Sequence, residues 1–369
     1  MKRKFQRLLS TLLCVGRIRL SASLLSIGCL LGCVVKKDVT PVPGVDTLAV
    51  REIAGDGPEA VDAGATVIAT LFQSGRFDEI ESLLLRYSLL SDCFDDGRFK
   101  LTSVEQFFDN LASPGDADFE ARYQQIRAWR TAHPNSVAAA RAEAVYWRNY
   151  AWHARGQDYG ANVPPEQMAL FLERLGKAGA VLAQSRSFAK QDPFWYVDSV
   201  EVAMESGQPL NVQLALYEEG KRSFPNFFIL DFAMLRNLEP RWGGSAEAQA
   251  AFIERAVTQA PKSEAEIVYT RLWWFVDQGV TSDGSGTLVA NGLSWPRMRE
   301  GFEQLTGRWR SSSWIASNFA YFACREFDWA TYTRVRGNLG PMIRADLFRI
   351  PFPLSDCDER SKSTAQRLP

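Results

Sequence analysis

The stretch "SVAAARAEAVYWRNYAWHARG" (residues 136–156) decides the fold class. Along it, apolar side chains recur at steps of three and four residues, at Ala140, Ala144, Trp147, Ala151 and Ala154. This spacing is typical of a helix that packs one face against a core. Ser136 is a residue type that caps helix starts, and Gly156 is one that ends helices in the left-handed conformation. The stretch therefore predicts a helix bounded by these two residues.

The same pattern continues on both sides of this stretch, interrupted by proline and glycine, from about Pro58 onward. It predicts further helices over 164–189, 193–206, 211–223, 227–239, 246–260, 263–279, 296–309, 314–326 and 329–336. No segment alternates with the two-residue period of a strand. The predicted class is all-α, with stacked antiparallel helical hairpins that form an α-solenoid.

Two short segments resemble the tetratricopeptide repeat. In "LFQSGRFDEIESLLLRY" (71–87), the turn glycine, the aromatic and the packing positions of the second half of such a unit are occupied by Gly75, Phe77, Ile80 and Leu84. "CREFDWATY" (324–332) echoes it through Phe327 and Ala330. We expect a tetratricopeptide-like domain over 58–354, and we expect the tail 355–369 to be disordered because it lacks an apolar period.

The N-terminus predicts export. Residues 1–32 combine six basic side chains with no acidic one and end in an apolar run, as in secretory signal peptides. "LLGC" (30–33) resembles a bacterial lipobox, with Cys33 as the lipidated residue and 33–57 as a flexible tether. A translation start near Val15, a lipobox ending at Cys29 and an uncleaved anchor remain alternatives. Val34 after Cys33 favours an outer-membrane lipoprotein facing the periplasm, with the inner membrane as the alternative.

Charge and cysteine content narrow the function further. Without the six basic residues of the leader, the 42 basic and 43 acidic side chains become 36 and 43, a net charge of −7. Nucleic-acid binding calls for a basic face, so we expect no nucleic-acid partner. Cys93, Cys324 and Cys357 remain beyond Cys33, and their odd number allows at most one internal disulfide. We expect Cys324 to be buried on a helix face and the other two to lie near the surface.

Motifs of known chemistry are absent. The only histidines, His133 and His153, have no second ligand at helical spacing, and no HExxH, paired CxxC, GxSxG or phosphate-loop pattern occurs. "SDGSGT" (282–287) is interpreted as a solvent loop, and the acidic residues 92, 95 and 96 as a solvated turn with at most weak cation binding. We expect no catalytic residue, no cofactor and no metal site.

The corner "LEPRWGGS" (238–245) admits two interpretations. As structure, Pro240 ends one helix, Gly243 and Gly244 make the turn, and Ser245 caps the next helix. As a site, Arg241 and Trp242 with the N–H groups of the glycine pair could hold an anion. The sequence favours the structural interpretation.

Arginine also accompanies tryptophan elsewhere in the chain. Trp147, Arg148, Trp152 and Arg155 are candidate binding residues, because arginine stacked on aromatic rings can line a groove for a peptide or an anionic glycan. Arginine stems also pack routinely over buried aromatic rings. Core packing is therefore the favoured interpretation here as well.

Four strings carry a family resemblance: "LEPRWGGS", "YAWHARG" (150–156), "DPFWY" (192–196) and "SWPRMREGFEQL" (294–305). They look like an uncharacterised bacterial family catalogued as domain of unknown function 4034, over about residues 120–330. The resemblance implies a tetratricopeptide-like helical domain. It implies no activity and no catalytic residues.

Two functional hypotheses follow. The first is a membrane-tethered helical-repeat interaction module or scaffold, whose concave face holds a protein or peptide. The second is a periplasmic enzyme on a helical scaffold that acts on cell-wall glycan through carboxylates such as Glu143 or Asp198.

Overall fold

A computed structural model describes residues 53–87, 92–111, 116–156, 158–280 and 292–365. The predicted signal peptide, the lipidation site Cys33, the tether up to residue 52 and the loop 282–287 lie outside the described residues. Within the described ranges, no helix is both long enough and apolar enough to cross a membrane.

The described part of the chain is all-α, as predicted, and its one β-type pairing is an isolated bridge between Cys93 and Phe99. The α-helices are α2 (Gly57–Gln73), α3 (Phe77–Tyr87), α4 (Thr102–Leu111), α5 (Asp116–Ala132), α6 (Val137–Arg155), α7 (Pro165–Ala189), α8 (Pro193–Glu205), α9 (Leu210–Ser223), α10 (Ile229–Asn237), α11 (Ala246–Gln259), α12 (Ala265–Val280), α13 (Trp295–Arg308), α14 (Ser313–Arg325), α15 (Trp329–Leu339) and α16 (Leu354–Ala365). Short 3₁₀ turns lie at Gly160–Asn162, Pro240–Trp242, Gly340–Met342 and Ala345–Leu347.

Helix ends follow the local signals in the sequence. The Ser136 hydroxyl accepts a hydrogen bond from the Ala139 N–H at 3.0 Å, and Gly156 follows α6 with φ +73°. Gly75 has φ +68° in the turn between α2 and α3, and Phe77 stacks on Trp129 with ring centroids 6.0 Å apart. Ser136, Gly156 and Gly75 thus lie at helix boundaries as predicted, whereas α15 continues past the predicted end at residue 336, through Gly337, to Leu339.

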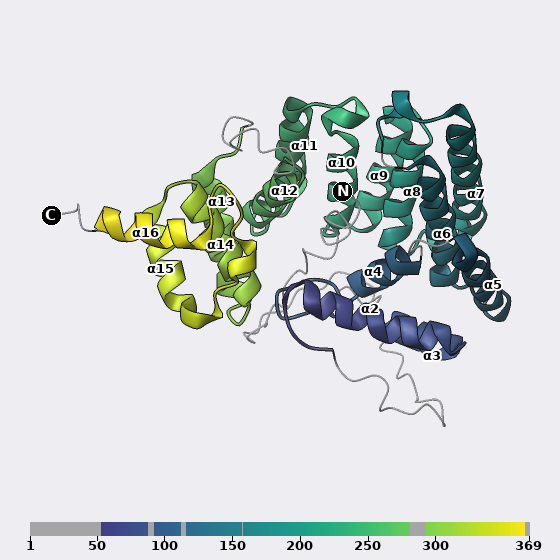
Figure 1. The fold of residues 1–369 in the computed structure, drawn as a ribbon, viewed down its shortest axis with the longest axis horizontal. Helices are drawn as coiled ribbons and strands as arrows, with labels where there is room; N and C mark the ends of the chain where they lie inside the picture. Colours follow the sequence, from purple (N-terminus) through teal and green to yellow (C-terminus); the bar gives the residue numbers. More distant parts are fainter. Residues whose placement is uncertain (1–52, 88–91, 112–115, 157, 281–291, 366–369) are drawn as a thin grey trace, which may run out of the picture.

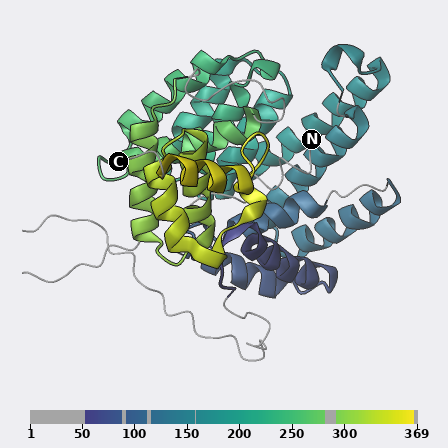
Figure 2. The ribbon, with the colours of Figure 1, turned by 60° about the vertical axis from the view of Figure 1, so that its left-hand side comes forward.

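Consecutive helices pack as antiparallel neighbours and form a curved array (Figure 1). In that view α5 to α7 form one end, α8 to α12 the middle and α13 to α16 the other end. The α-solenoid prediction is therefore confirmed. Helices α2, α3 and α4 lie across the open side of the arc, and the turned view in Figure 2 shows the same arrangement.

The segment 92–101 joins the beginning of the chain to its later hairpins. The Phe99 ring lies 5.5 Å from that of Phe227, and the Arg98 guanidinium lies 5.3 Å from the Trp314 ring. The Asp56 carboxylate accepts a hydrogen bond from the Trp314 N–H at 2.8 Å. The side of the array that faces α2 and α4 is therefore filled by the chain itself.

Four expectations about local order and burial are wrong. Residues 355–365 are not disordered, because they form most of α16, and Cys357 is fully buried and disulfide-bonded to Cys324 of α14. The acidic turn is not solvated throughout, because Asp96 is buried and forms an ion pair with Arg98 at 2.5 Å. Residues 53–57 of the expected tether belong to the fold through contacts such as that of Asp56.

Candidate functional site

The predicted corner has the geometry of a helix connection. Gly243 has φ +88°, and a Cβ on Gly244 would overlap the carbonyl of Leu238. The Ser245 hydroxyl caps α11 by accepting a hydrogen bond from the Ala248 N–H at 3.1 Å. Both glycines are thus required by the turn itself, and a binding role for this corner stays a prediction.

Two groups of candidate residues meet at this corner. The Trp242 ring packs edge-to-face on Trp152 of α6 with centroids 6.1 Å apart. The Arg155 guanidinium lies 5.0 Å from the Trp152 ring and 5.6 Å from Phe171 of α7. Arg241 is partly exposed and forms an ion pair with Glu239. This arginine–aromatic cluster joins the end of α6 to the corner.

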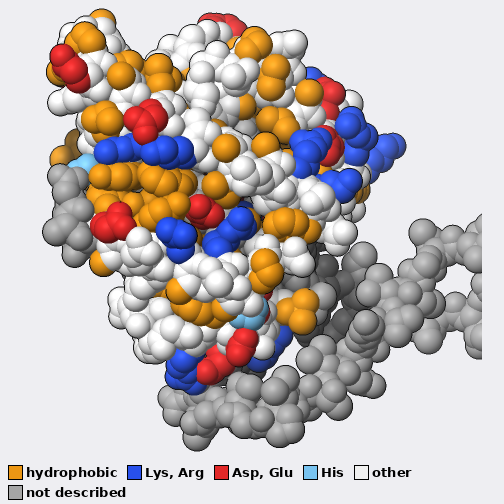
Figure 3. All heavy atoms as spheres, turned by 90° about the vertical axis from the view of Figure 1, so that its right-hand side faces the viewer, with side chains coloured by type: hydrophobic (Ala, Val, Ile, Leu, Met, Phe, Trp, Pro, Cys, Tyr) orange, Lys and Arg blue, Asp and Glu red, His pale blue; other side chains and the backbone are white. Residues whose placement is uncertain are grey.

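Trp147 lies on another face of α6. Its ring is 5.0 Å from that of Tyr123 of α5, and the Lys177 ammonium of α7 lies 4.6 Å from it. Figure 3 shows hydrophobic side chains gathered on the side of the molecule where α5 to α7 lie, with basic side chains beside them. The eight binding candidates therefore do not form one site.

Arg148 is part of the interior between α6 and α8. Its guanidinium donates to both carboxylate oxygens of Glu205 at 2.8 and 2.7 Å, and it forms an ion pair with Glu201 at 2.5 Å. Burial alone would raise the pKa of the Glu205 carboxyl, but Arg148 and Arg236 hold it below its usual value. Arg148 is thus committed to internal partners.

The carboxylates proposed for an enzyme lie in separate clusters. Asp198 is buried and accepts a hydrogen bond from Arg141 at 2.7 Å, and burial raises its pKa to about 6 despite this partner. Glu143 forms an ion pair with Arg130 at 3.1 Å and accepts a hydrogen bond from Tyr123. The two carboxylates therefore do not flank a common space, as a glycosidase pair must.

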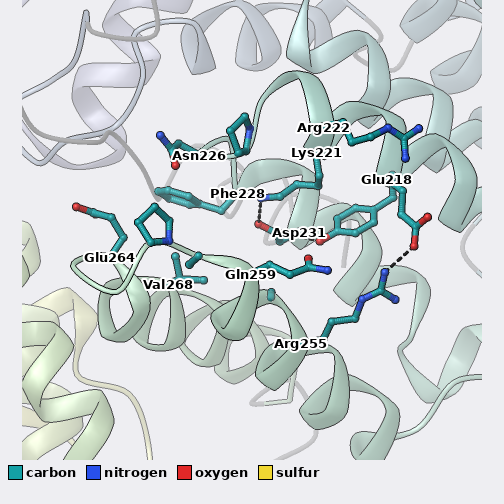
Figure 4. A pocket seen from close by; sticks show the side chains of 15 residues that line it. Glu218, Lys221, Arg222, Asn226, Phe228, Asp231, Arg255, Gln259, Glu264 and Val268 are labelled. Carbon is teal, nitrogen blue, oxygen red and sulfur yellow. Dashed lines mark hydrogen bonds and ion pairs between the residues drawn. The ribbon is translucent and has the colours of Figure 1, made fainter. Parts of the chain in front are cut away.

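A cavity of about 310 Å³ opens between the hairpins α9–α10 and α11–α12 (Figure 4). Its apolar lining includes Phe228 and Val268, which are buried, and the ring of Tyr217. Asn226 and Gln259 lie on exposed positions at its edge, contributed by the turn after α9 and by the last turn of α11. The cavity thus combines an apolar floor with a polar rim, as ligand sites commonly do.

Charged side chains of the cavity are held in pairs. Lys221 donates to Asp231 at 2.8 Å, and the Tyr217 hydroxyl donates to the other oxygen of the same carboxylate at 2.6 Å. Burial, together with Asp231, raises the pKa of Tyr217. Arg255 donates to Glu218 at 2.6 Å. Because each pair holds its cation in place, it also orients the other N–H groups of Lys221 and Arg255.

Only part of this cavity could be predicted from the sequence. Pro225 and Pro261 mark the two turns beside the cavity, and they lie in the gaps between the helices predicted over 211–223 and 227–239 and over 246–260 and 263–279. The residues that face one another across it come from different hairpins, and no spacing within one helix reveals that pairing. Among the described residues, no cluster of histidine, cysteine or carboxylate side chains could hold a metal ion.

Comparison with known proteins links part of the chain to a family. Residues 65–193 match the family model described as Domain of unknown function (DUF4034). This segment, about a third of the chain, is similar to the DUF4034 family. No curated protein and no solved structure matches the chain.

The DUF4034 match confirms the resemblance and locates it differently. It begins within α2 and ends at the first residue of α8, whereas the resemblance was expected over about 120–330. The corner 238–245 and the cavity lie outside the DUF4034 match. Arg141 and Arg148 lie inside it.

Proposed function

We propose that this chain is a membrane-tethered helical-repeat protein of the bacterial envelope, which holds a protein or peptide partner. The observation that carries the proposal is the cavity between α9–α10 and α11–α12, because it offers an apolar floor and charged groups on packed helices. The partner site suggested first, the concave face, is filled by segment 92–101. The cavity is the alternative surface on the same scaffold.

Three features support a location in the envelope. The leader resembles a lipoprotein signal with Cys33 as the modified residue, which would anchor the chain in the outer membrane facing the periplasm. The buried Cys324–Cys357 disulfide is typical of proteins in oxidising compartments. The negative charge of the mature chain argues against a nucleic-acid partner.

The proposal is tested by site-specific photo-crosslinking in the native bacterium. A photo-reactive amino acid replaces Gln259, which lies at the cavity edge in the last turn of α11. The matched control replaces Glu247, which is exposed in the first turn of the same helix. We expect a defined crosslinked protein from position 259 and none from position 247. Equal products from both positions, or no product from either, would refute the proposal.

Two variants separate the cavity from the other candidate surface. Ala260→Leu narrows the cavity without removing a charge, since Ala260 lines it at a partly exposed position. Arg241→Ala removes the arginine of the corner cluster. We expect Ala260→Leu to abolish the crosslink at position 259 and Arg241→Ala to preserve it. The reverse result would transfer the partner site to the corner around Arg241, Trp242, Trp152 and Arg155.

A further inference from the structure

Lys221 is the cation best placed to meet a ligand in the cavity. Its ammonium group lies on the cavity side of α9 and is held by Asp231 at 2.8 Å (Figure 4). An ammonium group carries three N–H donors, and this contact uses one of them. The Lys221 side chain is 17% exposed, whereas that of Asp231 is 1% exposed. The remaining donors of Lys221 are therefore fixed in direction and accessible from the cavity.

The charge balance of the cavity favours an anion. Three cations and three carboxylates line it, namely Lys221, Arg222, Arg255, Glu218, Asp231 and Glu264. Both oxygens of Glu264 accept hydrogen bonds from Arg308 of α13, which lies outside the lining, at 2.8 Å. With Glu264 neutralised from outside, the lining has an excess of one positive charge. A ligand with a single negative charge would balance it.

The floor of the cavity requires an apolar group on the same ligand. Phe228, Ala256 and Val268 are between 3% and 7% exposed, so their small accessible surfaces form the floor of the lining. An inorganic anion would leave this surface in contact with water. A ligand that carries a carboxylate beside an apolar side chain would satisfy Lys221 and cover the floor.

We propose that the cavity binds the carboxy-terminus of a peptide whose last side chain is apolar. The terminal carboxylate accepts hydrogen bonds from Lys221 and from the N–H groups that Arg255 keeps beside Glu218. The last side chain covers Phe228 and Val268, and the preceding backbone leaves past the amides of Asn226 and Gln259. The cavity of about 310 Å³ is at the lower end of the range of roughly 300–1,000 Å³ for ligand sites. It has room for the end of a chain rather than a long segment. This inference rests on the proposed function and specifies its ligand.

The test uses the full chain, purified in detergent and immobilised. Two pools of acetylated pentapeptides, randomised at the last two positions, are applied: one with free carboxylates and one with carboxamides. Retained peptides are identified by mass spectrometry, and the best are measured by fluorescence polarisation. We expect retained free acids with apolar last residues, and we expect amidation to weaken binding at least about tenfold, since a charge-assisted hydrogen bond is lost. Equal retention of both pools, or of neither, overturns the inference.

Variants test whether the preference for free acids over carboxamides arises in the cavity. Lys221→Gln should weaken the free acids about tenfold and leave the carboxamides unchanged, whereas Ala260→Leu should weaken both. Lys262→Gln, at an exposed position next to the lining residue Pro261 but outside the lining itself, is the matched control and should change affinity less than about threefold. A thermal melt of each variant shows that it is folded. If Lys221→Gln melts below the assay temperature, the preference for free acids over carboxamides in the wild-type chain still decides the question.

Two competition experiments distinguish a peptide carboxy-terminus from a small free anion as the ligand. N-acetyl-leucine and inorganic phosphate are added as competitors of the best peptide. Competition by N-acetyl-leucine at the peptide's own concentration overturns the peptide assignment in favour of a small carboxylate. If the crosslink at position 259 forms but the pools show no preference for free acids, this inference fails and the proposed function stands. If the crosslink does not form, the proposed function itself fails.

Discussion

Replacing Arg148 by methionine distinguishes a structural arginine from a binding one. Arg148 lies between α6 and α8, and its partners Glu201 and Glu205 have side chains that are 3% and 0% exposed. Methionine keeps part of the apolar volume but removes the charge. Glu205 then retains Arg236, at 3.8 Å, and the hydrogen bond from the Trp152 side chain. Removing one partner of a buried ion pair costs about 3–5 kcal/mol, because the other charge remains buried without full compensation.

This loss is large compared with the stability of a domain, which is about 5–15 kcal/mol. Urea unfolding, followed by the fluorescence of the eleven tryptophans, measures it directly. Arg255→Met is the matched control, because Arg255 forms its ion pair with Glu218 at exposed positions. We expect that control to lose at most about 1 kcal/mol. The double variant Arg148→Met/Glu205→Gln should be more stable than Arg148→Met alone.

The loss of stability in Arg148→Met should also depend on pH. In the wild type, the pKa of Glu205 is held below its usual value of 4.5, so its contribution to stability is present above that value and is lost on further acidification. In the variant, burial remains and the main opposing cation is gone, so the pKa of Glu205 rises above 4.5. As the pH falls, Glu205 is therefore protonated at a higher pH in the variant than in the wild type, and this protonation removes the destabilising buried charge. The stability difference between the two proteins should therefore shrink between pH 7 and about pH 4.5.

A stable Arg148→Met variant would refute this reasoning. If its unfolding midpoint in urea equals that of the wild type while crosslinking to a partner is lost, Arg148 is a recognition residue. A stability difference that grows on acidification would contradict the assignment to buried carboxylates.

Three further predictions concern the closure of the fold and the anchor. Gly97→Leu should destabilise the chain by about 2 kcal/mol or more and increase proteolysis near residue 97, because Gly97 has φ +79° and its Cβ would overlap the Trp309 ring. A smaller loss of stability in Gly97→Leu than in an exposed control such as Gly307→Leu would refute this prediction. Cys324→Ser/Cys357→Ser should lower stability by about 2–4 kcal/mol, since the disulfide joins residues 33 positions apart. Cys33→Ala should abolish labelling by palmitate and partitioning into detergent; persistence of both would refute the lipoprotein assignment.

Local features of the fold were predictable because their causes are local. The start of α6 at Ser136 and its end at Gly156 follow from a hydroxyl and from a glycine that adopts a positive φ within the same segment. The corner after Pro240 likewise follows from Gly243 and Ser245. Each of these needs a few neighbouring residues, and the pattern of their side chains is visible in the sequence.

The features that were missed depend on residues far apart in the chain. Asp56 binds the N–H of Trp314, which is 258 residues later, and no periodicity links the two. The tail was expected to be disordered because its apolar residues are few, but the disulfide to Cys324 and the burial of Cys357 hold α16 on α14. The cavity was missed for the same reason, since its walls belong to two hairpins.

The position of the DUF4034 match suggests a division of roles along the chain. The match ends at residue 193 and contains Arg141 and Arg148, whose partners on α8 make this part of the array depend on buried charge pairs. The cavity begins at Tyr217, beyond the match. Substitutions at the buried arginines should therefore lower stability and partner binding together. Substitutions such as Ala260→Leu should lower binding while the unfolding midpoint stays within the error of the measurement. If the two properties cannot be separated at Ala260, the cavity belongs to the scaffold and is not the recognition site.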